Sequence, residues 1–296
     1  MQHFKIIGLF LVTALASQLN SCTLEGVENP DEVDSDIISN QGIDTAATEE
    51  ENKVLMLADT VDGEPNSMVY QRADGLRVEW DIKKDDKQVQ LNDVVMVNYT
   101  ARVAAGEDYD SNKELGRAVP LKSNVGMMIP GWEEGLLQMH EGDKGRIMIP
   151  SAQAYGEDGY LTIVPPDADI IVDIEIVSIV QPILLEDGVK VYKWATNPEG
   201  NLAKKNQLIT FDYFAYKKGK NAGMYDNSYQ NEAPFSFKFK NASVVDGLHI
   251  GMSVIKTGES AFIEIPSKAA YGSKGLLDLV PSNTDIVYDV RIESIL

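Results

Sequence analysis

Hydrophobic and polar residues alternate along most of the chain beyond residue 72, which is the pattern of β-strands with one buried face. The alternation appears in two separate halves and is interrupted in each by Gly- and Pro-containing turns. The predicted strands include residues 95–99, 145–149 and 170–179 in the first half and residues 209–213, 261–265 and 286–295 in the second.

One short helix is predicted in each half, where the hydrophobic period changes from two to three or four. Trp132, Leu136 and Met139 recur at spacings of four and three, and Gly142 is a helix stop. The second half repeats this design with Leu248, Met252, Ile255 and Gly258. The pattern predicts an α+β fold, in which an antiparallel sheet packs on a single short helix in each half.

The two halves are copies of one domain. The segment Asp-Gly-Leu-Arg-Val at residues 74–78 recurs as Asp-Gly-Val-Lys-Val at residues 187–191, and an offset of 116 pairs Ala-Tyr-Gly at 154–156 with the same tripeptide at 270–272. This period is too long for a solenoid, whose repeats are about 20–50 residues. We therefore expect two domains, at residues 72–181 and 182–296.

The first 21 residues have the features of an export signal. Lys5 precedes the apolar run 6–16, which is shorter than the roughly 20 residues needed to cross a bilayer. The sequence Leu-Asn-Ser-Cys that follows resembles the lipobox of bacterial lipoproteins, which implies that Cys22 is lipid-modified and begins the mature chain. The alternatives are a plainly cleaved secretory signal and an uncleaved anchor with a chance cysteine. We expect export and lipid attachment to a bacterial membrane, with the outer membrane favoured.

Residues 22–71 are predicted to be a largely disordered, acidic tether. Ten acidic side chains and no lysine or arginine fall within residues 23–52, and such a segment cannot bury enough surface to offset its ordering entropy. The formal charge of the whole chain is −20, which disfavours binding to nucleic acid. One cysteine cannot form an internal disulfide, and three scattered histidines predict no zinc site.

No nucleophile elbow, phosphate loop or dinucleotide fingerprint is present in the sequence. Instead, a set of aromatic and aliphatic segments recurs in a fixed order. In the first copy these segments are residues 94–100, Tyr-Asp-Ser at 109–111, Met-Ile-Pro-Gly-Trp-Glu-Glu-Gly-Leu at 128–136, Ala-Tyr-Gly at 154–156 and Ile-Val-Pro-Pro at 163–166. The ordered set resembles the FKBP-type peptidyl-prolyl cis-trans isomerases, and the second copy resembles them again.

The resemblance implies a half-wrapped antiparallel sheet on a short helix, with a hydrophobic pocket between them. Rotation about a peptide C–N bond meets a barrier of about 18–20 kcal/mol, because resonance holds the amide planar. The planar amide is the more charge-separated form, so water favours it. A dry pocket that binds the twisted form lowers the barrier by differential stabilisation, and this requires no metal, cofactor or nucleophile.

The resemblance also implies roles for individual residues of the first copy. Trp132 would form the floor under the proline ring, and the Tyr155 hydroxyl and the Ile129 amide would donate to substrate carbonyls. Asp110, held by Tyr99, would face the rotating amide. The pocket walls would comprise Tyr99, Tyr109, Leu121, Met128 and Val172, and an overhanging loop would contain Tyr160, Ile163 and Val164.

Both copies depart from the family pattern. Tyr109 stands where the family usually has Phe, and we expect its buried hydroxyl to have a partner, because an unsatisfied polar group costs about 1–3 kcal/mol. In the second copy Leu248 replaces the floor tryptophan and weakens the contact with a proline ring by about 1–2 kcal/mol. The second pocket is predicted to comprise Tyr213, Tyr225, Asp226, Phe235, Val244, Val245, Leu248, Tyr271, Leu279, Val280 and Tyr288.

Each of these residues also has a purely structural interpretation. A tryptophan on an amphipathic helix is usually part of the core, and Asp110 before Ser-Asn is a common turn former. Three functions therefore stay open. The first is a lipid-anchored isomerase, expected to be a monomer, that acts on proline-containing exported polypeptides, with the first copy more active. The second is a non-catalytic, FKBP-like lipoprotein that binds clients or partners. The third is a lipoprotein that binds a ligand unrelated to proline.

Overall fold

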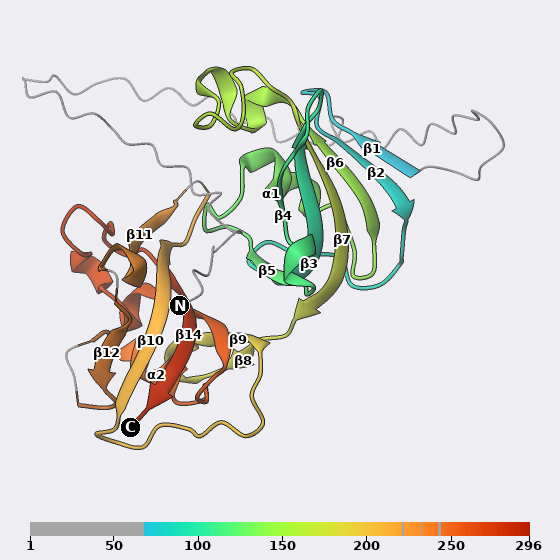
Figure 1. Cartoon of the computed structure of the whole chain (residues 1–296). Helices are drawn as coiled ribbons and strands as arrows, with labels where there is room; N and C mark the ends of the chain where they lie inside the picture. Colours follow the sequence, from blue (N-terminus) through green and yellow to red (C-terminus); the bar gives the residue numbers. More distant parts are fainter. Residues whose placement is uncertain (1–67, 221, 232, 242–243) are drawn as a thin grey trace, which may run out of the picture.

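The computed structural model describes residues 68–220, 222–231, 233–241 and 244–296, which form two sheet-and-helix domains (Figure 1). The predicted signal peptide, Cys22 and most of the predicted tether lie outside these residues. Domain 1 contains β1 (Met68–Gln71), β2 (Arg77–Ile82), β3 (Val94–Val103), β4 (Asp108–Ser111), β5 (Val119–Lys122), α1 (Pro130–Leu136), β6 (Lys144–Ile149) and β7 (Ile170–Val180). Domain 2 contains β8 (Ile183–Leu184), β9 (Lys190–Ala195), β10 (Leu208–Lys217), β11 (Met224–Asn227), β12 (Phe235–Lys238), α2 (Asp246–Met252), β13 (Ser260–Ile265) and β14 (Ile286–Ile295).

The two sheets have the same topology, and all of their strand pairs are antiparallel. In domain 1 the strand order is β1-β2-β6-β7-β3-β4, with β5 also paired to β3. In domain 2 the order is β8-β9-β13-β14-β10-β11, with β12 also paired to β10. Sequence neighbours are therefore not always sheet neighbours, and the long β3 and β10 each pair with three strands. The predicted α+β fold with two tandem domains is confirmed.

Each short helix lies very close to its sheet because two glycines face the strand beneath it. A Cβ atom on Gly131 or Gly135 of α1 would come within 2.4 Å of the side chains of Ile149 and Ile147. Gly247 and Gly251 of α2 meet Ile265 and Ile263 in the same way. Both helices have only seven residues and end before Met139 and Ile255, so they are shorter than the hydrophobic period predicts.

The predicted boundary at residue 72 is four residues too late. Met68–Gln71 form β1, an edge strand that pairs with β2 through Val69–Glu79 and Tyr70–Val78. The strand has only two half-buried residues, so its hydrophobic pattern is too short to distinguish it from the acidic segment before it. The sheet of domain 1 therefore begins within the segment predicted as tether.

Candidate functional site

Tyr99, Asp110 and Trp132 meet between the sheet and the helix of domain 1. Tyr99 lies on β3 and Asp110 on the adjacent β4, and the Tyr99 hydroxyl donates a hydrogen bond to Asp110 Oδ2 at 2.8 Å. The Tyr99 ring packs edge-on against Trp132, with ring centroids 5.1 Å apart. Trp132 is 1% exposed and belongs to the core of domain 1. The contact between Tyr99 and Asp110 that the family resemblance predicts is therefore present.

Burial governs the electrostatics of this cluster. Burial raises the pKa of Asp110, against the lowering effect of the hydrogen bond from Tyr99. Burial also raises the pKa of Tyr99, and the neighbouring Asp110 charge adds to this. The tyrosine therefore stays a neutral donor at physiological pH. Together, these groups provide a site with little water and one oriented carboxyl group.

Three buried polar groups in this region make no hydrogen bond of full geometry among the described residues: the indole N–H of Trp132 and the hydroxyls of Tyr109 and Tyr155, which lie close enough to interact with each other. Burial raises the pKa of Tyr109 to about 12, and it raises the pKa of Tyr155 further. Both hydroxyls therefore keep their protons. The group nearest to a partner for the Tyr109 hydroxyl is the Tyr155 hydroxyl, and the contact between them falls short of a full hydrogen bond.

The two domains differ at the wall beside these hydroxyls, where Val172 lies on β7 and its equivalent Tyr288 lies on β14. Val172 pairs with Ala101 in domain 1, and Tyr288 pairs with Ala215 at the matching position of domain 2. Valine offers no acceptor. An unsatisfied buried hydroxyl costs about 1–3 kcal/mol, so a group from outside the protein gains by binding there.

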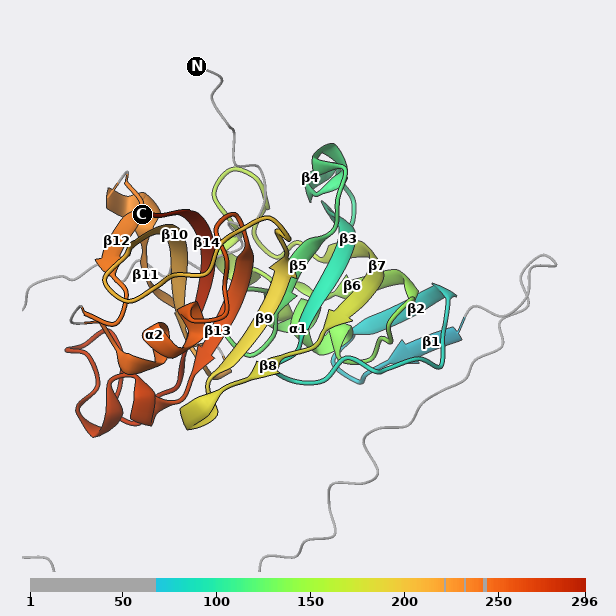
Figure 2. The same ribbon diagram turned by 90° about the horizontal axis from the view of Figure 1, so that it is seen from below.

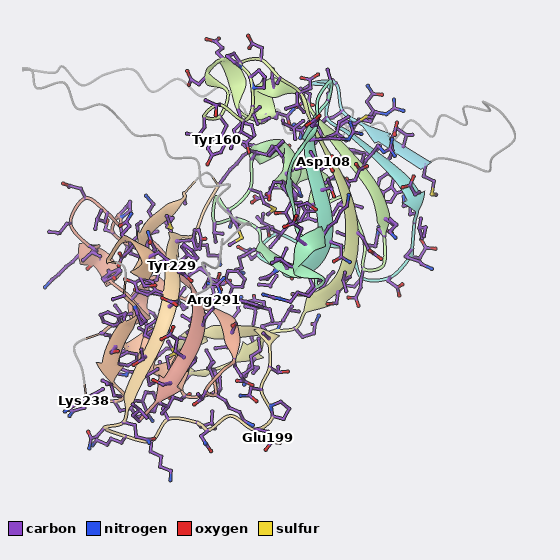
Figure 3. All side chains as sticks on the ribbon, viewed as in Figure 1. Asp108, Tyr160, Glu199, Tyr229, Lys238 and Arg291 are labelled. Atoms are coloured by element: carbon purple, nitrogen blue, oxygen red, sulfur yellow. The ribbon has the colours of Figure 1, made fainter. Side chains whose placement is uncertain are left out.

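The loop between β6 and β7 contains Tyr160, which is labelled in Figure 3. The Tyr160 ring stacks on Tyr155 with centroids 5.1 Å apart, and the Tyr160 amide donates to the Val164 carbonyl at 2.9 Å. Ile163 is half exposed, which agrees with a position on an overhanging loop. Val164 is different, because its side chain is buried in the domain core rather than overhanging.

The remaining predicted residues of the first pocket are buried. Leu121 on β5 and Val172 on β7 are fully buried in the core, and Met128 is 5% exposed. Ile129 caps α1 in an extended conformation, and its carbonyl accepts the first helical hydrogen bonds. In the described part of the chain no residue accepts a backbone hydrogen bond from the Ile129 amide, so this amide is a fourth available donor.

Domain 2 has the same frame but pairs its tyrosines internally. The Tyr213 hydroxyl donates to Asp226 Oδ2 at 2.6 Å, and the Tyr225 hydroxyl donates to the Tyr288 hydroxyl at 3.3 Å. The Tyr271 ring lies edge-on to Tyr225, with centroids 6.5 Å apart. None of these hydroxyls is both buried and unpaired. The second site therefore offers fewer free donors than the first.

The other predicted residues of the second pocket fall into three groups. Leu248, at the position of Trp132, is buried, and so is Val280, which packs in the core rather than on the loop. Val244 and Val245 are partly buried beside the core. Phe235 and Leu279 are exposed at 41% and 47%. The pairing of tyrosine hydroxyls was not predicted, although the change from Val172 to Tyr288 was the sequence signal for it.

The described residues contain neither a cluster of three or more potential metal ligands nor a helix that is long and apolar enough to cross a membrane.

An aromatic site between a half-wrapped antiparallel sheet and one short helix, with a tyrosine–aspartate pair on adjacent strands, is the arrangement of the FKBP class of prolyl isomerases. The family model described as "FKBP-type peptidyl-prolyl cis-trans isomerase" matches residues 85–177 and again residues 200–293. The chain belongs to this family, through two consecutive domains.

Known proteins of the family align with one or both domains. The chain is 27% identical over 207 residues to bovine peptidyl-prolyl cis-trans isomerase FKBP9, covering 70% of this chain and 35% of that protein. It is 37% identical over 93 residues to FK506-binding protein 2 of Yarrowia lipolytica, covering 31% and 65%. The crystal structure of the three FKBP domains of wheat FKBP73 is 22% identical, with a TM-score of 0.39, and covers 76% of this chain and 96% of that one. The chain thus spans about a third of the length of the first curated relatives.

Proposed function

We propose that the protein is a peptidyl-prolyl cis-trans isomerase and that domain 1 is its catalytic domain. The observation that carries this proposal is the set of buried donors on Tyr109, Tyr155 and Trp132 around the Tyr99–Asp110 pair, none of which makes a hydrogen bond of full geometry, the two hydroxyls having only each other. Donors that are unpaired in the free protein gain full hydrogen bonds when a substrate carbonyl enters. The Tyr225 hydroxyl of domain 2, which is equivalent to that of Tyr109, already donates a hydrogen bond to Tyr288.

The geometry supports catalysis by binding the twisted amide. The rings of Trp132 and Tyr99 exclude water from the proline side of the bond, which removes the solvent stabilisation of the planar amide. The Tyr155 hydroxyl and the Ile129 amide hold the flanking carbonyls, and Asp110 acts through its field on the rotating group. Each ~1.4 kcal/mol of differential stabilisation gives a tenfold increase in rate, so a few contacts suffice.

Domain 2 is proposed as the less active copy. Leu248 removes the aromatic floor and the indole donor, and the contact between Tyr225 and Tyr288 uses hydroxyls that domain 1 leaves free. Such a domain binds polypeptide more readily than it turns it over. The alternative function for the whole chain, a non-catalytic client-binding protein, extends this behaviour to both domains.

Isomerisation of a short X-Pro peptide by the full chain distinguishes the two functions. We expect catalysis by the natural chain and a loss of about tenfold or more in kcat/KM for Trp132→Leu, because the substitution removes about 1.4 kcal/mol or more of ring contact and hydrogen bonding. Leu248→Met in domain 2 is the comparison and should change the rate little. A natural chain with no rate above the uncatalysed reaction, but with measurable peptide binding, would favour the non-catalytic function.

Export and lipid attachment through Cys22 are also proposed, since the segment before this only cysteine has the features of a lipoprotein signal. The clients would then be exported, proline-containing polypeptides. Cys22→Ala should release the protein from the membrane fraction of the producing bacterium and abolish labelling by a fatty-acid analogue. Membrane retention of this variant would contradict the lipid anchor without affecting the isomerase proposal.

A further inference from the structure

The outer face of the domain 2 sheet, which points away from α2, is aromatic where the equivalent face of domain 1 is charged. The strand registers match: Glu79 pairs with Arg146 in domain 1, and Tyr192 pairs with Phe262 in domain 2. Five equivalent positions are occupied by Glu79, Asp81, Thr100, Arg102 and Arg146 in domain 1 and by Tyr192, Trp194, Phe214, Tyr216 and Phe262 in domain 2. An aromatic patch of this size is unfavourable in water and needs a cover.

Domain 1 is that cover. Tyr192, Tyr216 and Phe262 are buried in one continuous hydrophobic cluster with Val125 and Met127, which lie between β5 and α1 of domain 1. Both views of the ribbon place β5 beside β9 (Figures 1 and 2). The segment of domain 1 that leads into the candidate pocket is therefore the segment that lies against domain 2.

A buried ion pair fixes this contact. Lys122, the last residue of β5, is 0% exposed, and its ammonium group lies 3.1 Å from Glu264 Oε2 on β13 and over the Tyr192 ring. Glu264 also contacts Lys190 and Lys218. A buried charge that loses its partner is strongly destabilising, so this pair allows only one arrangement of β5 on the domain 2 sheet.

A second set of contacts joins domain 2 to the start of α1. The Gly219 amide donates to the Asn124 carbonyl at 2.8 Å, and the Asn124 amide donates to Glu133 of α1 at 2.9 Å. Lys220 lies 3.4 Å from Glu134 and lines the same small cavity as Met128. Domain 2 therefore contacts both the loop before α1 and the first turn of the helix.

The backbones of the two domains also come close together at Gly126 and Gly223. A Cβ atom on Gly126 would lie 2.8 Å from the backbone nitrogen of Gly223, which cannot move aside as a flexible side chain can. Gly126 precedes Met128 by two residues and Ile129 by three. Any displacement here is transmitted directly to the predicted pocket wall and to the free amide.

We propose that domain 2 is a positioning element for the domain 1 pocket: its outer sheet face and the residues before β11 set the position of Met128 and of the Ile129 amide. Gly126, Gly223, Lys122 and Glu264 are positioning residues in this arrangement and do not touch the substrate. The proposal rests on the isomerase function of domain 1 and adds that the active domain depends on its neighbour for catalytic geometry.

The decisive comparison is between two glycines of domain 1 in the full chain. Gly126 and Gly116 have similar left-handed backbone conformations, with φ of +68° and +61°, but the space around a Cβ on Gly116 is open. Gly126→Ala and Gly116→Ala therefore impose similar backbone strain, and only the first displaces domain 2. We expect Gly126→Ala to lower kcat/KM on an X-Pro peptide by about tenfold, since a misplacement of 1 Å costs about that much or more. Gly116→Ala should stay within about twofold of the natural chain, as expected of a change that leaves the catalytic geometry intact.

A second pair of variants tests the proposal independently, in case the glycine variants do not fold. Glu264→Gln removes the interdomain charge, whereas Glu175→Gln removes a carboxylate of the exposed Lys144–Glu175 pair on the domain 1 sheet. Kinetics are measured well below the unfolding temperature of every variant, so that a change in kcat/KM reports pocket geometry. We expect a loss for Glu264→Gln only.

Hydrogen–deuterium exchange of residues 123–136 provides a readout that does not need activity. We expect faster exchange there in Gly126→Ala and Glu264→Gln, with residues 144–149 and both control variants unchanged. Equal kinetics and equal exchange within each pair would overturn the positioning role. An inactive natural chain would contradict the isomerase proposal instead, and the exchange rates alone would then decide whether domain 2 holds this segment in place.

Discussion

The difference between Val172 and Tyr288 decides which domain has unpaired donors. In domain 2 the Tyr288 hydroxyl accepts a hydrogen bond from Tyr225, whereas Val172 offers no acceptor in domain 1 and leaves the Tyr109 and Tyr155 hydroxyls with only each other and no hydrogen bond of full geometry. Free proteins rarely keep such groups, because each costs about 1–3 kcal/mol. Their presence at one site and absence at the equivalent site is therefore best explained by a ligand that completes them.

Tyr155→Phe should separate function from stability. Removing an unpaired buried hydroxyl should raise the free energy of unfolding by about 1 kcal/mol while lowering kcat/KM by about three- to tenfold, since a hydrogen bond to substrate is worth roughly 0.5–1.5 kcal/mol. Denaturant titration and the peptide assay measure the two effects.

Tyr225→Phe in domain 2 is the matched control for this substitution. It removes a hydroxyl that already has a partner, so it should lower the free energy of unfolding by about 1 kcal/mol and leave the rate almost unchanged. If Tyr155→Phe destabilises the protein as Tyr225→Phe does, the hydroxyl has a structural partner and the functional interpretation fails.

At the scale of secondary-structure elements, β5 and β13 hold the two domains together through Lys122 and Glu264. Burial alone would raise the pKa of Glu264, but Lys122 and Lys218 outweigh this and hold the pKa at about 2. Burial lowers the pKa of Lys122, against the effect of Glu264. The contact therefore depends on an ionised carboxylate at a pH where an ordinary glutamate begins to protonate.

This shift predicts a pH dependence of stability. A carboxyl group whose native pKa is about 2, below its ordinary 4.5, stabilises the folded protein fully above pH 4.5 and loses that contribution as the pH falls toward 2. We expect the unfolding temperature of the natural chain to fall more steeply over this range than that of Glu264→Gln. Glu175→Gln serves as the control, and parallel curves for all three proteins would contradict the assigned role of the ion pair.

The elements themselves were largely predictable. Period-two stretches and the spacing of Trp132 and Leu136 locate the main strands and both helices, because each element buries one face against a single core. The edge strand β1 was missed because four residues carry too little pattern. The domain contact was also missed, although Phe214 and Tyr216 interrupt the polar positions of β10 and make that strand apolar on both faces.

The sequence predicted some contacts of the site and missed others, because a local pattern reports strand pairing but not the packing of residues that are distant in the sequence. The Tyr99–Asp110 contact follows from strand pairing, which a family pattern preserves. Val164 was predicted on an overhanging loop and Val280 in the second pocket, but a tight turn directs both side chains into the core. The hydrogen bonding of a buried hydroxyl depends on neighbours that are distant in the sequence. A local sequence pattern therefore does not predict it.

At the scale of the whole molecule, the two domains are unequal partners. Domain 1 has a charged outer sheet face that water can solvate, whereas the outer face of domain 2 is aromatic and is covered by domain 1. The two copies of one fold have thus diverged: one face has become an internal contact, and one pocket has kept its free donors. Under the proposed function, the pair is a catalytic domain on a supporting domain.

Separated domains should therefore behave differently. Residues 182–296 alone would expose Tyr192, Tyr216 and Phe262, and we expect this fragment to self-associate and to bind a hydrophobic dye. Residues 68–181 alone expose a smaller apolar surface around Val125 and Met127, and should stay monomeric with reduced kcat/KM. Analytical ultracentrifugation and the peptide assay measure both results, and a monomeric, dye-free domain 2 fragment would show that its aromatic face needs no cover.

The covered aromatic face also has a consequence for biosynthesis. A ribosome makes domain 1 first, and domains generally fold as units in the order in which they emerge. Domain 1 is therefore already folded when β9 to β14 leave the ribosome. The aromatic outer face of the domain 2 sheet can pack against domain 1 as soon as it forms. If domain 2 were synthesised first, its aromatic outer face would be exposed to solvent until domain 1 had folded. We therefore expect a circular permutant with domain 2 first to form inclusion bodies.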